Sequence, residues 1–234
     1  MKRFTTYINE SKRGNVTSLP TKKSTILFND IKGSSMLWSD NEEEMFEALD
    51  KLEKLMGKLI KDHNGLIVKT IGDSYMCSYE EEDSLFDAIK MAINIQKSLN
   101  EDPIKVGDNE VKIRIGICYG DVYIKKSEIQ GVELKDYFGN TVGSASRLES
   151  KVSDVDGFVF SFLSDIGDES EKEILDFLKD NDIDIEVIEY DKDCDRSKNR
   201  KRSGRLLTDL QISSCKDIEK LKGVKPLIAY KCKV

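Results

Sequence analysis

The stretch that decides the fold is Thr25-Ile26-Leu27-Phe28-Asn29-Asp30-Ile31-Lys32-Gly33-Ser34-Ser35, and its counterpart is Val68-Lys69-Thr70-Ile71-Gly72-Asp73-Ser74-Tyr75-Met76. Each contains a short apolar run typical of a β-strand, with an aspartate at its end or in the following turn. One helix-length segment separates Asp30 from Asp73, so both acids can reach one end of one sheet. A glycine lies close to each, and acids beside backbone that a ligand can approach suit hard cations and phosphate.

The hydrophobic pattern around these stretches predicts an α+β protein with a ferredoxin-like β-α-β-β-α-β core. Acids at 40–44 predict the start of the first helix, and Asn64-Gly65 predicts its end. Gly72-Asp73 predicts the tip of a β-hairpin. The core strands are expected at 24–29, 66–70, 75–79 and 111–118, and the core helices at 40–63 and 85–99.

The remaining segments are predicted as additions to this core. Gly120-Asp121 predicts a turn into a short strand over 122–124, and Thr141 predicts the start of a short helix. The charged insert at 191–205 is expected to be a solvated loop, with an interaction patch as the alternative. The other expected elements are a loop over 135–140, strands at 157–162, 183–190 and 227–230, and a helix at 170–179.

Composition excludes several classes of protein. The formal net charge of −7 over 234 residues argues against a nucleic-acid-binding face spread over the whole protein. Five scattered cysteines and a single histidine, His63, argue against a zinc site and a disulfide framework, which favours a cytoplasmic protein with reduced thiols. Because no apolar run approaches the roughly 18–20 residues of a membrane span, we expect a soluble chain.

The two aspartates are more informative together than apart. A single aspartate in a turn is most often a solvated surface residue. Two unpaired acids within about 4–6 Å of each other repel unless a cation lies between them. Magnesium prefers carboxylate, water and phosphate oxygens, so a nucleoside triphosphate is the expected third component.

The chain from about Thr25 to Phe162 resembles the catalytic domain of class III nucleotidyl cyclases, the adenylate and guanylate cyclase family. We assign the catalytic domain to 24–234. The polar residues 1–23 are expected to form an N-terminal arm that is partly ordered or packs on a partner subunit. A weaker fifth match is Leu221-Lys222-Gly223-Val224. The four motifs that carry the resemblance, in family order, are Phe28-Asn29-Asp30-Ile31-Lys32-Gly33-Ser34, Val68-Lys69-Thr70-Ile71-Gly72-Asp73-Ser74-Tyr75-Met76, Arg114-Ile115-Gly116-Ile117-Cys118-Tyr119-Gly120 and Phe138-Gly139-Asn140-Thr141-Val142-Gly143-Ser144-Ala145-Ser146-Arg147-Leu148-Glu149.

This resemblance implies a metal site. Asp30 and Asp73 would hold two divalent cations, Mg²⁺ or Mn²⁺, with the Ile31 carbonyl as an added ligand. Two-metal catalysis would then drive attack of the ribose 3′-hydroxyl on the triphosphate, giving a 3′,5′-cyclic nucleotide and pyrophosphate. Backbone amides at Gly33 and Ser34 would approach the phosphate oxygens.

The resemblance also implies the substrate. Lys69 and Asp136 match the lysine and the acid with which adenylate cyclases recognise adenine, whereas guanylate cyclases typically carry Glu and Cys. Arg147 matches the arginine that stabilises charge in the transition state. The alternatives are an outward-pointing strand lysine at 69 and a helix-surface arginine at 147 that pairs with Glu149.

Three positions depart from the family pattern. Gly143 stands where the family usually has the asparagine that positions the ribose. Ser34 replaces a phenylalanine. The phosphate-binding lysine aligns with Val224, so Lys222 or Lys225 would have to serve instead.

In this family the metal aspartates come from one subunit, and the base-recognition and transition-state residues come from the other. This chain holds both sets, which implies a homodimer with two equivalent sites. The leading hypothesis is an adenylate cyclase that uses ATP. The alternatives are a cyclase acting on another nucleotide, GTP or a pyrimidine nucleotide that yields cCMP or cUMP, and a catalytically degenerate domain that binds a nucleotide or a partner.

Overall fold

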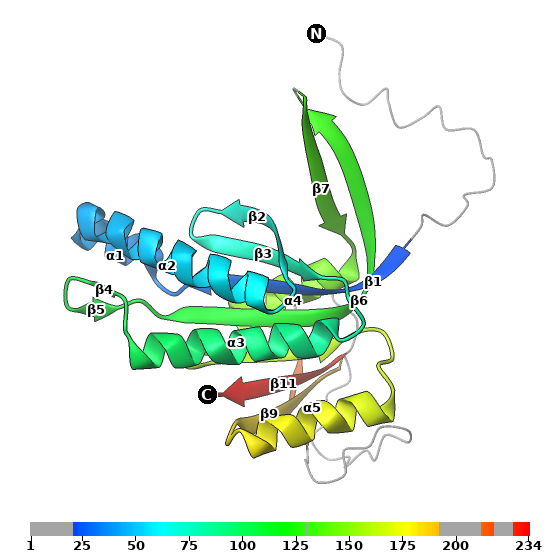
Figure 1. Ribbon diagram of the computed structural model, residues 1–234. Helices are drawn as coiled ribbons and strands as arrows, with labels where there is room; N and C mark the ends of the chain where they lie inside the picture. The colour runs from blue at the N-terminus through cyan, green and yellow to red at the C-terminus, as the bar shows by residue number, and fades with distance from the viewer. Residues whose placement is uncertain (1–20, 130, 192–211, 218–226) are drawn as a thin grey trace.

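The computed structural model describes residues 21–129, 131–191, 212–217 and 227–234 (Figure 1). The N-terminal half contains β1 (Thr21–Ile31), α1 (Ser34–Asp40), α2 (Glu42–Asp62), β2 (Leu66–Ile71), β3 (Ser74–Tyr79), α3 (Ser84–Glu101), β4 (Lys105–Val106) and β5 (Asn109–Glu110). The C-terminal half contains β6 (Ile113–Ile129), β7 (Val132–Phe138), α4 (Asn140–Lys151), β8 (Gly157–Phe162), α5 (Asp168–Asp180), β9 (Asp184–Asp191), β10 (Ile212–Asp217) and β11 (Leu227–Lys233).

The sheet contains the predicted ferredoxin-like core. Its strands lie in the order β6-β1-β3-β2, and each neighbouring pair is antiparallel, as a split β-α-β arrangement requires. Strands β8, β11, β9 and β10 continue the same sheet beyond β6. The predicted α+β fold is therefore confirmed.

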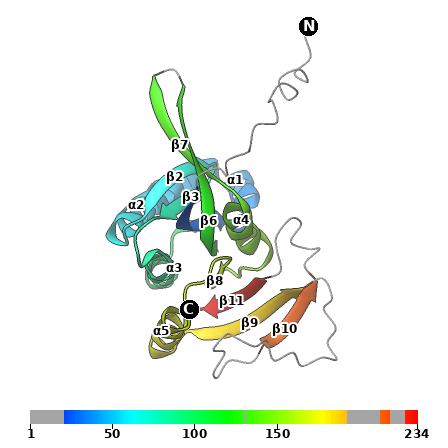
Figure 2. The same cartoon turned by 90° about the vertical axis from the view of Figure 1, so that its right-hand side faces the viewer.

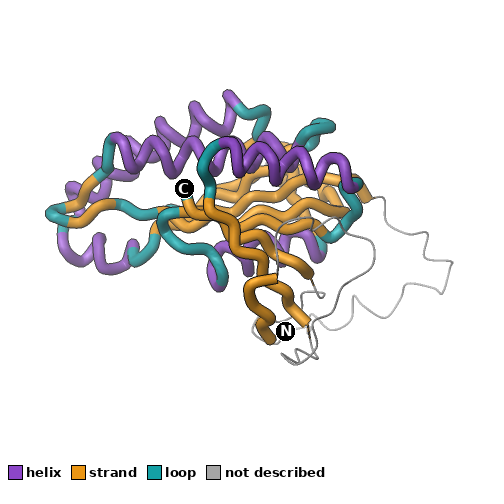
Figure 3. The backbone as a smooth tube through the Cα atoms, turned by 90° about the horizontal axis from the view of Figure 1, so that it is seen from below, coloured by secondary structure: helices purple, strands orange, loops and turns teal. Residues whose placement is uncertain are grey.

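Side chains on the two faces of the sheet form separate apolar clusters. On β1, Leu27 belongs to the cluster that α2 and α3 cover, whereas its neighbour Ile26 belongs to the cluster that includes Ala145 and Leu148 of α4. This alternation is the period of two expected for a strand buried on both faces. Figure 2 shows the resulting layers, with α2 and α3 on one side of the sheet and α4 on the other, and Figure 3 shows helices on both sides of the sheet.

The predicted turn at Gly120-Asp121 is wrong. The chain runs straight through it as one strand, β6, and residues 132–138, part of which was predicted as a loop, form its partner β7. Gly120 has a different role: a Cβ there would lie 2.8 Å from the Thr141 hydroxyl oxygen, so the glycine permits close packing against α4. The β6–β7 hairpin projects from the body of the protein (Figure 2).

Several boundaries also differ from the predicted ones. β1 begins at Thr21 rather than Ser24, and α1, which follows Gly33, was not predicted. β10, which pairs in parallel with β9, was not predicted. Residues 192–205 of the charged insert, and residues 1–20 of the arm, lie outside the described residues.

Other predictions agree closely with the structure. The hairpin tip at Gly72-Asp73 lies between β2 and β3, and β8 has the predicted bounds. None of the helices in the described ranges combines the length and the apolar character needed to cross a bilayer.

Candidate active site

The two aspartate segments meet at one end of the core. Gly72 turns the chain between β2 and β3 with a φ of +62°, in the left-handed region that favours glycine. The next strand begins with Ser74, whose hydroxyl donates to Asp30 Oδ1 at 2.5 Å. This bond ties the turn that carries Asp73 to the end of β1, where Asp30 lies, as the sequence predicted.

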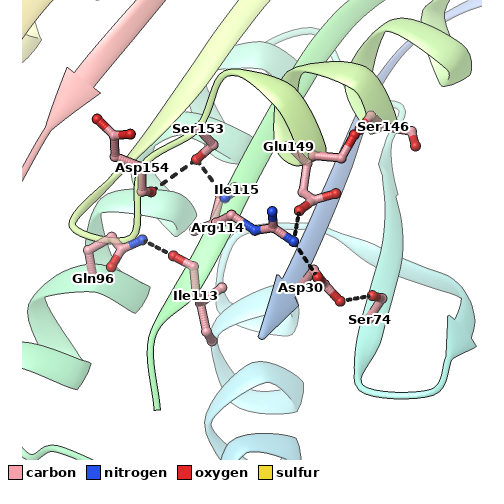
Figure 4. A network of polar contacts seen from close by, with 11 residues as sticks. Asp30, Ser74, Gln96, Ile113, Arg114, Ile115, Ser146, Glu149, Ser153 and Asp154 are labelled. Atoms are coloured by element: carbon pink, nitrogen blue, oxygen red, sulfur yellow. Dashed lines mark hydrogen bonds and ion pairs between the residues drawn. The ribbon is translucent and has the colours of Figure 1, made fainter. Parts of the chain in front are cut away.

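Asp30 also contacts Arg114, a residue to which the sequence motifs assign no role. Arg114 lies directly opposite Asp30 in the β1–β6 ladder, and its Nη2 atom lies 2.6 Å from Asp30 Oδ2. The same nitrogen lies 3.1 Å from Glu149 Oε1 on α4 (Figure 4). The sequence gives little signal for this contact, because Arg114 lies opposite the apolar side of the alternation over 111–118, where a charged residue is expected.

Glu149 is almost fully buried, with 7% of its surface exposed. Burial is the largest cause of a rise in its pKa to about 7; the Arg114 charge lowers it and the Asp30 charge raises it. The alternative pairing of Arg147 with Glu149 is therefore replaced by a contact between Glu149 and Arg114. The arginine lies between two carboxylates that would otherwise repel each other.

The residues at the turn fit a hard divalent cation. Asp73 Oδ2 is buried and has no hydrogen-bond partner among the described residues, which is costly for a carboxylate oxygen without a cation. Asp30 lies beside the same turn, and Ile31 follows it at the end of β1. Carboxylate and carbonyl oxygens are the donors that Mg²⁺ and Mn²⁺ prefer.

Lys69 and Asp136 lie in direct contact. The Lys69 Nζ atom, on β2, lies 2.9 Å from Asp136 Oδ1 and 2.8 Å from Oδ2, on β7. Both side chains are partly exposed, at 40% for Lys69 and 33% for Asp136, so a ligand can reach the pair. The amide of Tyr137 donates to Asp136 Oδ1 at 2.8 Å and helps to orient the carboxylate. Lys69 and Asp136, 67 positions apart in the sequence, are thus in contact, and a joint role in base recognition requires such proximity.

Gly143 and Arg147 lie one turn apart on α4, on the same helix face, and both are exposed. An added Cβ at Gly143 would meet nothing within 4 Å, so the position has room for a side chain. At Gly116 on β6, by contrast, a Cβ would lie 2.2 Å from the Glu149 amide nitrogen. That close approach fixes α4, and with it Arg147, against β6.

The remaining predicted residues are divided between the described and the undescribed chain. Gly33 has a φ of +74° and precedes α1, whose first residue is Ser34, so both lie near Asp30 in sequence and structure. An approach of their amides to phosphate stays a prediction. Lys222, Lys225 and Val224 lie outside the described residues.

Comparison with known proteins identifies the family. The profile described as the adenylate and guanylate cyclase catalytic domain matches residues 16–156, more than half of the chain. The chain belongs to the adenylate and guanylate cyclase family. This confirms the family that the motifs indicated.

Individual cyclases are only distantly similar. The adenylate cyclase of Podospora anserina is 28% identical over 146 residues, which is 56% of this chain and 7% of that protein. The chain thus spans a small part of that relative's length. The guanylate cyclase domain of RhGC from Catenaria anguillulae, solved with GTP, has a TM-score of 0.63 at 18% identity and covers 92% of this chain and 98% of its own.

A second solved cyclase has the other named specificity. The adenylyl cyclase CyaB from P. aeruginosa has a TM-score of 0.62 at 20% identity, covering 92% of this chain and 96% of its own. Identities this low show a common fold. The base specificity therefore has to be argued from this chain's own residues.

Proposed function

We propose that this cyclase domain converts ATP to 3′,5′-cyclic AMP and pyrophosphate by two-metal-ion catalysis at a homodimer interface. The observation that carries the choice of ATP is the contact between Lys69 and Asp136. It places one donor and one acceptor side by side.

The pattern of donor and acceptor favours adenine over guanine. The Lys69 ammonium donates to an adenine ring nitrogen, and the Asp136 carboxylate accepts from the exocyclic amine. Guanine presents a carbonyl oxygen where adenine has that amine, so Asp136 would face another acceptor. An acceptor that the bound base desolvates and leaves without a donor costs about 1–3 kcal/mol, which gives a preference for ATP of roughly 5- to 160-fold.

At the other half of the site, Asp30, Asp73 and the Ile31 carbonyl would hold two Mg²⁺ or Mn²⁺ ions. When bound, the ions would assist deprotonation of the ribose 3′-hydroxyl and offset charge on the pyrophosphate. The protein's own contribution is to orient the phosphates and supply a fixed cation. We assign that cation to Arg147, and the phosphate contacts to Gly33, Ser34 and one of Lys222 and Lys225.

A homodimer is supported by exposed apolar side chains beside the recognition pair. Leu66, Ile67 and Ile71 of β2 and Val132 and Leu134 of β7 are 41–58% exposed, on the two strands that carry Lys69 and Asp136. Exposed apolar residues gathered on two contacting strands are typical of a protein interface.

The lack of zinc or disulfide patterns in the sequence supports a cytoplasmic location.

The test of activity compares nucleotides. Purified protein is incubated separately with ATP, GTP, CTP and UTP, each with Mg²⁺ or Mn²⁺, and the products are identified by mass spectrometry. Cyclic AMP as the main product supports the proposal. Cyclic GMP or a cyclic pyrimidine nucleotide as the main product would support cyclase activity but reject adenine recognition by Lys69 and Asp136. The absence of any product with either metal would favour a degenerate binding domain.

The test of the shared site mixes two inactive variants. Asp73→Ala removes a metal ligand, and Arg147→Ala removes the transition-state cation. If each site takes Asp73 from one subunit and Arg147 from the other, an equal mixture regains roughly a quarter of the wild-type activity, because half of the dimers then hold one intact site of two. Absence of any recovery after subunit exchange would contradict a shared site.

A further inference from the structure

A second charged cluster lies behind the Lys69–Asp136 pair. Glu80, the residue after β3, accepts hydrogen bonds from three side chains. Lys22 of β1 donates to Oε2 at 2.7 Å, Lys135 of β7 donates to Oε1 at 2.5 Å, and the Tyr137 hydroxyl also donates to Oε1. One carboxylate therefore connects β1, β3 and β7.

The two β7 donors flank Asp136. Residues 135 and 137 of a strand lie on one face and residue 136 lies on the other. Glu80 thus holds β7 from one side, and Asp136 projects from the other side toward Lys69. The contact fixes the strand immediately before and immediately after the base-recognition acid.

β7 needs such an attachment because its ladder holds it on one edge only. It pairs with β6 and with no other described strand, and the paired segment of β6 extends beyond the part that pairs with β1. Tyr137 is 1% exposed and packs in the apolar cluster on the α4 face, which gives the attachment a buried anchor. The Lys135 ammonium lies 5.1 Å from the Tyr137 ring centroid.

The charge of Glu80 is maintained by its partners. Partial burial alone would raise its pKa, but the hydrogen bonds from Lys135, Lys22 and Tyr137 lower the pKa to about 2. The carboxylate is therefore ionised at neutral pH and accepts all three bonds. Charge-assisted hydrogen bonds of this kind are stronger and more directional than neutral ones.

We propose that Glu80 is a positioning residue for base recognition, which sets the place of Asp136 relative to Lys69 by anchoring β7 through Lys135 and Tyr137. This inference rests on the proposed function, since it concerns how the same site distinguishes adenine from guanine. Weakening the anchor releases Asp136 from its place beside Lys69. The preference for adenine then falls, while Arg147 and the metal aspartates, on other elements, keep their positions.

The test uses two conservative variants and a matched control. Glu80→Gln keeps the shape of the side chain and removes its charge, and Tyr137→Phe keeps the buried ring and removes only the hydroxyl. The control is Glu110→Gln, which neutralises an exposed glutamate in a surface ion pair with Lys112 and leaves β7 untouched. Thermal unfolding confirms that each variant is folded, and Tyr137→Phe decides the question if Glu80→Gln does not fold.

Two readouts are compared. The first is kcat and KM for ATP and GTP. The second is the dissociation constant of 3′-deoxy-ATP and of 3′-deoxy-GTP, which lack the attacking hydroxyl and so report base recognition without turnover. We expect both variants to lower the preference for the adenine compound roughly tenfold through KM and the dissociation constant, with kcat changed about twofold or less. The control keeps the wild-type preference.

An unchanged preference in folded Glu80→Gln and Tyr137→Phe would overturn the positioning role, and so would a loss confined to kcat. These results differ from failure of the proposed function. If the wild type binds 3′-deoxy-ATP in preference to 3′-deoxy-GTP but forms no cyclic nucleotide, catalysis is rejected and the variants still test the anchor. If the wild type binds neither analogue, both proposals are rejected.

Discussion

Replacing Glu149 with glutamine should change how the stability of the protein depends on pH. Burial raises the pKa of Glu149 from 4.5 to about 7 in the folded chain, with Arg114 and Lys151 opposing the rise and Asp30 adding to it. The folded state therefore holds a proton that the unfolded chain releases near pH 4.5. The contribution to stability is full below pH 4.5 and is lost as the pH rises through about 7. The gap between the two pKa values corresponds to roughly 3 kcal/mol.

Urea unfolding of the wild type and of Glu149→Gln, at several values between pH 4.5 and pH 8, measures this contribution. Excess EDTA keeps divalent cations from binding near Asp30. The glutamine cannot ionise, so the stability of the variant relative to the wild type should rise by up to roughly 3 kcal/mol between pH 5 and pH 8. Glu173→Gln, an exposed change on α5, is the control and should show no such trend. A difference that stays flat across this range, or that falls, would refute the account of Glu149 as a carboxylate that burial keeps protonated.

Three further changes test the site itself. Asp73→Ala should lower kcat roughly 10²–10³-fold with either metal, and retained activity would reject the metal site. The thermal unfolding midpoint should stay unchanged or rise, because the change removes a buried oxygen that has no hydrogen-bond partner among the described residues. The double change Lys69→Glu with Asp136→Cys should lower the ATP preference at least tenfold, measured as the ratio of kcat/KM for ATP and GTP, and an unchanged ratio would reject this pair as the base reader. Gly143→Asn should raise kcat for ATP several-fold with a stability change within about 1 kcal/mol, because an added side chain there meets open space; a lower kcat would argue against a ribose contact at this position.

The elements that were predicted most closely are those whose own residues carry a clear apolar pattern or turn signal. α2 follows from an apolar stripe and an acidic first turn, and the β2–β3 hairpin follows from Gly72-Asp73. β7 was missed because it is a mostly exposed strand whose partner determines it, and Tyr137 is its one buried apolar residue. Gly120 was misinterpreted because a glycine that permits close packing looks the same in a sequence as a glycine that permits a turn.

The candidate site divides in a similar way. Asp30, Asp73, Lys69 and Asp136 were found through the family motifs, and the structure adds their contacts. The bridge from Arg114 to Glu149 joins residues 35 positions apart, and the contacts of Glu80 join segments still further apart. No periodicity encodes such pairs, because they depend on which strands and helices the fold brings together.

The absence of a side chain at Gly116 has a mechanical consequence. The backbone of α4 lies so close to β6 that no methyl group fits between them, so the helix has no room to roll or shift register on the strand. α4 and β6 therefore move as one rigid body. Any opening or closing of the site has to move Arg114, Glu149 and Arg147 together, and the hinge for that motion has to lie outside α4 and β6.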